Sequence, residues 1–424
     1  MVRITSEIGR LRRVVVQPPG PALERMLPRH IDPGSPDYLL FDDLVHVPKA
    51  LQEHQQLQAV LETMAEVLHF EDLLREVLSD KELRRSVVER VGVLHDLHPA
   101  AGHQLDQLDA GELTSTLLVG TVGGSLTAPE LFPPVPNLIF TRDLAAVVGD
   151  LMVVGNARRR ARQREAILSW AVMEHHPLFA DNQVAEISRW IRARGGSAPL
   201  TVEGGDVLCL SETIALIGAS ERTTWAMILL LSAELFDHGF TRVLIVEMPK
   251  QRSAMHLDTV FTLLDRQAAA VYDRILEPGG AEEVEVVGLR RKDGEIVVDQ
   301  YEGDLLHALA ENGHVLSPVL CGAGHPIHGR REQWTDGANY VALGPGVVIG
   351  YQRNEFTGRA MSEAGFRVVT PSVFISELSR DFHDDPDALL ASGRRYAVHI
   401  EGHELSRGRG GPRCLTLPLL RDPL

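Results

Sequence analysis

Short runs of β-branched residues recur along the chain, and each ends at a glycine or proline turn that leads past an arginine into a helical pattern. Apolar runs bounded by turn residues are typical of strands. The four clearest runs are Arg13–Val16, Leu151–Gly155, Ile214–Gly218 and Gly346–Gly350. The helices expected after them cover residues 22–26 and 165–172, a segment that ends at Leu235, and residues 357–364. Four loose copies of one unit predict strand–helix modules around an axis, although any α/β chain contains some runs of this kind.

Residues 70–128 interrupt this rhythm. From Glu71 to Leu78 and from Lys81 to Val91, apolar residues follow helical spacing with few strand signals. We therefore expect an all-helical insertion that ends near residue 128. It divides the chain into a first α/β part over residues 1–69, the insertion over 70–128, and the remaining α/β part over 129–424.

A second departure covers Arg380 to Glu404, which we expect to be irregular. It opens with several acidic residues, and Pro386 directly follows Asp385. Aspartate before proline is a common helix start, because proline tolerates the first helical position. A short helix is therefore predicted from Pro386 inside this segment.

Composition and charge narrow the class of protein. The 424 residues are 44% hydrophobic and 24% charged, and the formal net charge of −16 argues against nucleic acid or an anionic membrane as partner. Three cysteines make no disulfide framework, which suits a reducing compartment. Met1–Val16 lacks a signal-peptide core, and Trp225–Leu231, the longest apolar stretch, is too short to span a bilayer. We expect a soluble cytoplasmic protein.

The run Ser406–Cys414 combines three arginines and three glycines with a cysteine. Glycine lets the backbone pass close to a ligand, and nearby positive charge favours the nucleophilic thiolate. The run predicts a flexible active-site loop that closes over an anionic or carboxylate-bearing substrate.

Carboxylates gather in two other segments. Asn137–Asp143 is expected to form a short strand, with Asp143 just past its end. In Glu203-Gly204-Gly205-Asp206, two glycines between two acids predict a tight turn that could direct both carboxylates inward. Taken alone, each segment is better explained without a site: Asp143 as an exposed loop carboxylate paired with its neighbour Arg142, and residues 203–206 as an ordinary acidic turn.

His256-Leu257-Asp258 places an imidazole and a carboxylate two residues apart. In an extended segment both would project from the same face, and histidine is the natural proton shuttle near neutral pH. The alternative is an ordinary surface histidine. By contrast, Cys321–His328 lacks the second ligand pair of a structural zinc site, and we expect no metal there.

These segments together resemble the arginine deiminases of the guanidine-modifying superfamily. The resemblance implies a fold class of α/β type: a five-bladed, pseudo-symmetric α/β propeller with a helical insertion. It implies hydrolysis of L-arginine to L-citrulline and ammonia. The matching segments, in order, are Ser6–Arg12, Leu39–Asp43, Ala161–Glu165, Ser220–Thr223, Met255–Thr262, Glu332–Trp334, Gly344–Arg353, Arg409–Cys414 and Arg421–Pro423.

The resemblance also implies residue roles. Cys414 would attack the guanidinium carbon, and Asp143 and Asp258 would hold guanidinium N–H groups. His256 would protonate the departing ammonia and then activate water to hydrolyse a covalent thiouronium, while Glu203 would orient His256. This is nucleophilic catalysis with a positioned acid–base partner.

The far end of the substrate would meet two arginines. Arg162 and Arg222 match the family positions that bind the α-carboxylate, although Arg162 lies in an arginine-rich run that could be a solvated helix start. No cofactor or metal is implied, and relatives are often homo-oligomers. The remaining binding positions are Asn137, Phe140 and Leu40 at the amino-acid end, and Gly408 and Arg409 in a gating loop.

One departure from the family lies beside the nucleophile. Relatives usually carry histidine there, whereas this chain has Arg413 preceded by Pro412. We expect Arg413 to favour the Cys414 thiolate over a wide pH range and Pro412 to stiffen the loop. The alternatives are a methylarginine hydrolase, an amidinotransferase, or a non-catalytic arginine-binding protein. The insertion and the presence of both Asp143 and Asp258 favour unmodified arginine.

Overall fold

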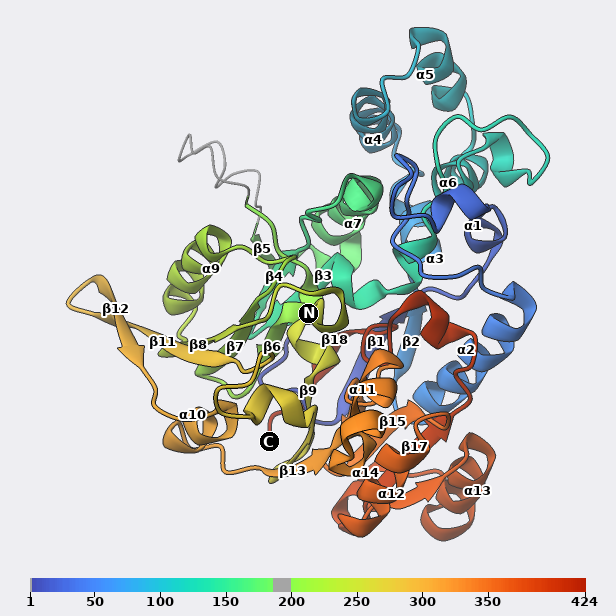
Figure 1. Cartoon of the computed structure of the whole chain (residues 1–424). Helices are drawn as coiled ribbons and strands as arrows, with labels where there is room; N and C mark the ends of the chain where they lie inside the picture. The colour runs from blue at the N-terminus through green and yellow to red at the C-terminus, as the bar shows by residue number, and fades with distance from the viewer. Residues whose placement is uncertain (1, 186–199) are drawn as a thin grey trace.

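The described residues form a mixed α/β structure whose strands are divided among five sheets (Figure 1). The computed structural model describes residues 2–185 and 200–424. In each of the five sheets one strand has an antiparallel neighbour on one side and a parallel neighbour on the other. These strands are β1 (Leu11–Val16), β4 (Leu151–Val154), β7 (Ile214–Ala219), β10 (Ala268–Val271) and β15 (Val347–Tyr351).

The recurring strand predicted from sequence is therefore confirmed in four places and was missed in a fifth. β1, β4, β7 and β15 are the four predicted runs. β10 escaped notice because its sequence, Ala-Ala-Ala-Val, contains a single β-branched residue. Small residues lower the strand signal, but all four β10 residues are buried, and its pairing on both sides defines the strand.

The neighbours of these strands complete the sheets. The antiparallel partners are β18 (Leu417–Arg421), β3 (Ala145–Val148), β6 (Val207–Cys209), β9 (Phe261–Asp265) and β14 (Val341–Gly344). The parallel partners are β2 (Glu66–His69), β5 (Gln183–Ala185), β8 (Arg242–Glu247), β13 (Ser317–Leu320) and β17 (Tyr396–Ile400). Further strands are β11 (Glu285–Lys292) and β12 (Glu295–Gln300) beyond β8, and β16 (Arg367–Val369) beside β17.

Helices make the parallel connections, as the geometry of parallel pairing demands. They are α2 (Val47–Glu62), α7 (Gln163–His175), α9 (Trp225–Asp237), α10 (Leu305–Glu311) and α12 (Glu355–Glu363). Within residues 2–185 and 200–424, the other helices of the α/β parts are α1 (Pro21–Glu24), α11 (Pro326–Trp334), α13 (Pro371–Phe382) and α14 (Pro386–Ala391). No helix among the described residues is long and apolar enough to cross a membrane.

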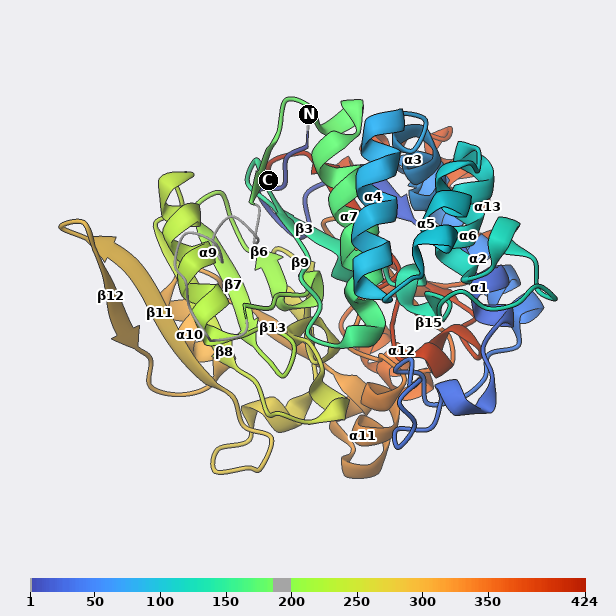
Figure 2. The same ribbon diagram turned by 90° about the horizontal axis from the view of Figure 1, so that it is seen from above.

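Four helices follow one another between β2 and β3. They are α3 (Phe70–Val77), α4 (Lys81–Leu94), α5 (Pro99–Asp106) and α6 (Ala110–Val119). α3 and α4 pack on α7, and Figure 2 shows the group gathered on one side of the molecule. Its apolar side chains join those of β3, β4 and α7 in one buried cluster, so this helical segment shares its core with the neighbouring sheet.

The structure corrects the irregular segment expected from Arg380 to Glu404. It contains the end of α13, the helix α14 and the fully buried strand β17. The helix start is confirmed: Asp385 caps α14 by accepting hydrogen bonds from the backbone N–H groups of Asp387 and Ala388. The strand was overlooked because β17, Tyr-Ala-Val-His-Ile, lies within a polar surrounding sequence.

Candidate active site

Side chains from distant parts of the chain meet in one small pocket. Apart from Glu203 and Asp258, which lie behind its wall, every predicted site residue lines it. The free volume is about 20 Å³, roughly the room needed by one water molecule, so the pocket must widen to admit a larger ligand. The lining residues are Leu40, Asn137, Phe140, Asp143, Arg162, Arg222, Met255, His256, Gly408, Arg409 and Cys414.

Asn137 and Asp143 reach the pocket from two short 3₁₀ helices. These cover Pro136–Ile139 and Thr141–Leu144, so the strand predicted for this segment is wrong. The apolar side chains that suggested a strand are buried all round instead of on one face, and β3 begins only at Ala145. Asp143 is therefore buried just before a strand.

The double glycine between Glu203 and Asp206 lets this turn pack against its neighbours. A side-chain Cβ on Gly204 would lie 2.1 Å from the backbone oxygen of Arg142, and one on Gly205 would lie 2.8 Å from the His256 ring. Only glycine fits these approaches. The predicted tight turn is confirmed as a 3₁₀ helix over Gly204–Asp206, and both flanking acids are buried.

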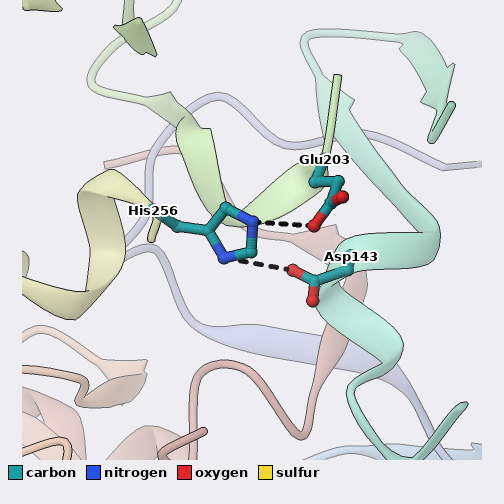
Figure 3. A group of neighbouring side chains, drawn as sticks. All are labelled: Asp143, Glu203 and His256. Carbon is teal, nitrogen blue, oxygen red and sulfur yellow. Dashed lines mark hydrogen bonds and ion pairs between the residues drawn. The ribbon is translucent and has the colours of Figure 1, made fainter. Parts of the chain in front are cut away.

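His256 lies between two carboxylates (Figure 3). Its Nε2 is 2.9 Å from Oε2 of Glu203, and its Nδ1 is 3.7 Å from Oδ1 of Asp143. Burial by itself would lower the pKa of His256, but Asp143, the hydrogen bond to Glu203 and the nearby Asp206 outweigh it and raise the pKa to about 10. The ligand-free site therefore holds an imidazolium at neutral pH.

Glu203 receives positive charge from three sides. Arg222 Nη1 lies 3.4 Å from its Oε1, and Arg162 Nη1 lies 3.3 Å from its Oε2. Burial would raise the pKa of Glu203, yet Arg222, His256 and Arg162 lower it well below its usual range. A permanently ionised Glu203 can keep His256 protonated and correctly oriented.

The turn also contains a carboxylate that the sequence prediction left out of the site. Asp206 Oδ2 accepts hydrogen bonds from the hydroxyls of Ser220 and Thr223, each at 2.6 Å, and Oδ1 accepts the N–H of Leu257 at 2.9 Å. Burial raises the pKa of Asp206 to about 6. Asp206 thus fixes the backbone directly after His256. Its position in the Glu-Gly-Gly-Asp run is the sequence feature from which this role could have been predicted.

Asp258 reaches the site by a route different from the one predicted. His256 is extended, but residues Leu257–Thr259 form a 3₁₀ helix, so the two side chains do not share one face of a strand. Asp258 turns instead toward Cys414, whose Sγ lies 3.8 Å from Oδ2 and 3.9 Å from Oδ1. His256 and Asp258 therefore approach the pocket from different directions.

Cys414 is 3% exposed, and its backbone N–H donates to Oδ1 of Asn339 at 3.1 Å. Burial, followed by the negative charges of Asp258 and Asp143, raises the pKa of the thiol well above its usual range. The expectation that Arg413 keeps a thiolate at this position is therefore wrong for the ligand-free protein. The guanidinium of Arg413 pairs with Asp258 instead.

Arg162 is buried and is no solvated helix start. Its Nη1 donates to Oδ2 of Asp143 at 2.6 Å and its Nε donates to Oε2 of Glu165 at 2.8 Å. Arg222 is also buried, with Nη2 3.5 Å from the sulfur of Met255, a pocket residue that the sequence prediction missed. Both arginines are thus held at the pocket by acids of the protein itself.

The run before Cys414 packs closely against Phe140. A Cβ on Gly408 would lie 2.8 Å from the Phe140 ring and one on Gly410 would lie 2.3 Å from it, so these glycines serve close packing. Arg409 has φ of 64° and stacks 3.6 Å from the centre of the Trp334 ring. Its three guanidinium nitrogens are buried and have no hydrogen-bond partner. Arg409 is therefore a cation at the pocket with unused donors.

The group Asp143, Glu203 and His256 has the ligand atoms that a metal ion would need, all within 4.8 Å of one another. Two features disfavour a metal here. Arg162 already donates to both carboxylates, and the raised pKa of His256 keeps a proton on the imidazole that would have to coordinate. The arrangement fits proton transfer and cation binding better than metal binding.

Comparisons of sequence link the chain to known proteins. A family model described as Arginine deiminase matches residues 37–108 and 123–383. Two proteins named arginine deiminase, from Bacillus cytotoxicus and Limosilactobacillus fermentum, are each 32% identical to the chain over 447 residues. Each alignment covers 100% of the chain and 99% of the relative, and so includes the segment around Cys414.

Comparisons of structure concern the fold alone, because the identities are low. SxtG, an amidinotransferase from Microseira wollei, aligns with a TM-score of 0.55 at 15% identity, over 100% of this chain and 98% of that one. A dimethylarginine dimethylaminohydrolase in an adduct with S-methyl-L-thiocitrulline gives 0.50 at 13% identity, over 96% of this chain and 99% of that one.

Proposed function

The chain belongs to the arginine deiminase family, and on that premise we propose how its residues carry out the hydrolysis of L-arginine to L-citrulline and ammonia. One observation carries the assignment of residues. The nucleophile candidate Cys414 lies in a closed pocket beside two buried aspartates, Asp143 and Asp258, which suit a planar cation.

Each aspartate offers one oxygen to the guanidinium group. Arg162 occupies Oδ2 of Asp143, whose buried Oδ1 has no hydrogen-bond partner. Arg413 occupies Oδ2 of Asp258 and leaves Oδ1 beside the Cys414 sulfur. A guanidinium held by these two oxygens would have its carbon directed at the thiol. Desolvated charge-assisted hydrogen bonds of this kind are the strong ones.

The first chemical step forms a bond between Cys414 Sγ and the guanidinium carbon. The arriving cation offsets the negative charges that raise the thiol pKa, so thiolate forms where the substrate is bound. His256, charged in the free site, donates its proton to the departing nitrogen. The C–N bond breaks. The departing nitrogen takes up the thiol proton of Cys414 as well, so it leaves as ammonium, His256 is left neutral and a covalent thiouronium cation remains.

The second step hydrolyses that intermediate. His256, now neutral, takes a proton from a water molecule that attacks the same carbon, and Glu203 stabilises the imidazolium that forms again. The C–S bond breaks, citrulline leaves and the Cys414 thiol is restored. The reaction therefore consumes one water and releases one ammonia per arginine.

The amino-acid end of the substrate would lie toward Arg222 and Arg162. Glu203 holds the guanidinium group of Arg222 at the pocket wall, and Asp143 holds that of Arg162. The guanidinium N–H groups that these acids do not bind would donate to the substrate carboxylate. Asn137 is fixed there by donating to the backbone oxygen of Leu39 at 2.7 Å. Phe140 and Leu40 would line the same end, and Gly408 and Arg409 would form the movable side.

The wider organisation stays a prediction. We propose that the five sheets are the blades of an α/β propeller, because β3 contacts β18 and β6, and β14 contacts β1 and β9. Residues 70–128 would be an insertion between parts 1–69 and 129–424. A homo-oligomer in the cytoplasm is also proposed; the three cysteines, all free and buried, fit a reducing compartment.

A turnover assay tests the proposed function. The protein is incubated with L-arginine, methylated arginines or agmatine, and citrulline-type products, amines and ammonia are measured together. We expect citrulline and ammonia in equal amounts from L-arginine with no added amine. Preferential release of methylamine would indicate a methylarginine hydrolase. A requirement for an amine acceptor would indicate a transferase, and no consumption of arginine would contradict the assignment.

A further inference from the structure

A buried chain of charges lies behind the pocket. Arg413 donates from Nη1 to Oδ2 of Asp258 at 2.7 Å, and from Nε and Nη2 to Oε2 of Glu7 at 3.1 and 3.0 Å. Nη2 also donates to the backbone oxygen of Val207 at 3.2 Å. Glu7 in turn accepts the N–H of Cys209 through Oε1. One guanidinium therefore connects Asp258 to the N-terminal segment and to β6.

Arg413 and Glu7 are held in their charged forms. Arg413 is 1% exposed and Asp258 is fully buried. Burial alone would lower the pKa of Arg413, but Glu7 and Asp258 raise it above its ordinary value. Burial would raise the pKa of Glu7, and Arg413, Arg142 and Arg421 lower it. A buried ion pair with such complete hydrogen bonding fixes geometry strongly, because losing either partner leaves an unpaired buried charge.

We propose that Arg413, anchored by Glu7, is a positioning residue that orients Asp258 for the reaction. It donates to Oδ2, and Oδ1, 3.9 Å from the Cys414 sulfur, is the oxygen without an arginine partner that would meet the substrate cation. This inference rests on the proposed role of Asp258 in holding the guanidinium. Arg413 would act on the reaction by orienting the Asp258 carboxylate, and not by changing the ionisation of the adjacent Cys414 thiol.

A lysine could not replace Arg413 fully. The planar guanidinium reaches Asp258, Glu7 and Val207 at once from three nitrogens, whereas an ammonium is a single point of charge. Displacing a reacting group by about 1 Å can cost roughly 10²-fold in rate. We therefore expect kcat/KM to fall about 100-fold in Arg413→Met, with partial recovery in Arg413→Lys.

A double-mutant cycle tests whether Arg413 acts through Asp258. Values of kcat/KM are measured for the parent, Arg413→Met, Asp258→Asn and the double variant. Arg395→Met is the control, because Arg395 is a half-buried arginine that donates to the backbone oxygen of Ala364 at 2.7 Å and pairs with Asp265 at 3.0 Å, away from Glu7 and Asp258. We expect the double variant to be no slower than Asp258→Asn alone, while Arg395→Met in its folded fraction stays within about threefold of the parent.

Two outcomes would overturn the inference: parent-like kcat/KM in Arg413→Met, or losses that multiply in the double variant. If Arg413→Met does not fold, as judged by its thermal transition, Arg413→Lys carries the same cycle. A parent-like Asp258→Asn variant is a different failure, because it would remove Asp258 from the proposed mechanism and leave Arg413 nothing catalytic to position.

Discussion

At the residue scale, the reactivity of Cys414 depends on its surroundings more than on its sequence neighbours. The thiol is buried near Asp258 and Asp143, and its pKa is raised accordingly. Arg413, the residue directly before Cys414, forms ion pairs with Asp258 and Glu7 instead of with the thiol. Local sequence predicted a stabilised thiolate, but burial of the thiol, followed by the negative charges of Asp258 and Asp143, raises its pKa instead.

Serine at position 414 tests the nucleophile. A serine hydroxyl beside the carboxylates of Asp143 and Asp258 is a far weaker nucleophile than a thiolate. The rate of citrulline formation by Cys414→Ser should therefore fall by on the order of 10⁴-fold or more. The substitution is small, and L-arginine binding measured by calorimetry should persist. Citrulline production near the parent rate would remove Cys414 from the mechanism.

Arg222→Ala tests the carboxylate end of the site. Loss of a charge-assisted hydrogen bond costs about 1.5–3 kcal/mol, so L-arginine should bind roughly 10- to 100-fold more weakly. Agmatine, which has the guanidine but no carboxylate, should lose much less affinity. Both are measured by calorimetry in the Cys414→Ser background, with Arg291→Ala on β11 as the control. Equal losses for the two ligands would exclude Arg222 from carboxylate binding.

The pKa of His256 predicts how stability depends on pH. It is about 10 in the folded protein, above the ordinary value of 6.5, so protonated His256 contributes its full stabilisation below about pH 6.5. That contribution is lost as the pH rises toward 10. Melting temperatures measured between pH 6 and pH 10 should fall more steeply for the parent than for His256→Asn. Parallel curves for the two proteins would contradict the raised pKa.

At the scale of elements, repeated strands were predictable and site-bearing segments were not. β1, β4, β7 and β15 could be predicted from their runs of β-branched residues. The segments that position Asp143, Asp206 and Asp258 are 3₁₀ helices, and short helices of this type have no sequence period long enough to detect. Their geometry is imposed by packing against neighbouring segments.

The turn at Gly205 gives a prediction at this scale. A methyl group there would meet the His256 ring at 2.8 Å, so Gly205→Ala should displace the imidazole and lower kcat by roughly 10²-fold. Gly92, within α4, has open space around its missing Cβ, and Gly92→Ala should leave kcat unchanged and stabilise the protein by about 1 kcal/mol. Equal kcat values for both variants would show that the turn does not hold His256.

At the scale of the whole molecule, the two ends of the chain meet next to the nucleophile. β18 begins three residues after Cys414 and pairs antiparallel with β1, with Leu417 opposite Val15 and Arg421 opposite Leu11 (Figure 1). The side chains of Leu417 and Leu419 are fully buried. The position of Cys414 therefore depends on the sheet in which β18 pairs with β1.

Truncation tests this closure. Deleting residues 417–424 removes β18 and exposes the apolar side of β1, so the variant should lose its cooperative melting transition and its activity. Deleting only the exposed residues 423–424 should change neither. Parent-like kcat/KM in the longer deletion would contradict the dependence of Cys414 on β18.

The reactive residues and most of the recurring strands could be identified from the amino-acid sequence alone, because residue identity and local apolar patterns do not depend on tertiary contacts. Contacts in the folded protein were needed to show that Oδ1 of Asp143 has no hydrogen-bond partner, that His256 is charged while Cys414 is protonated, and that Arg413 pairs with Asp258. These properties depend on burial and on pairs such as Glu7 with Arg413, which lie 406 positions apart in the chain. No local pattern carries that information.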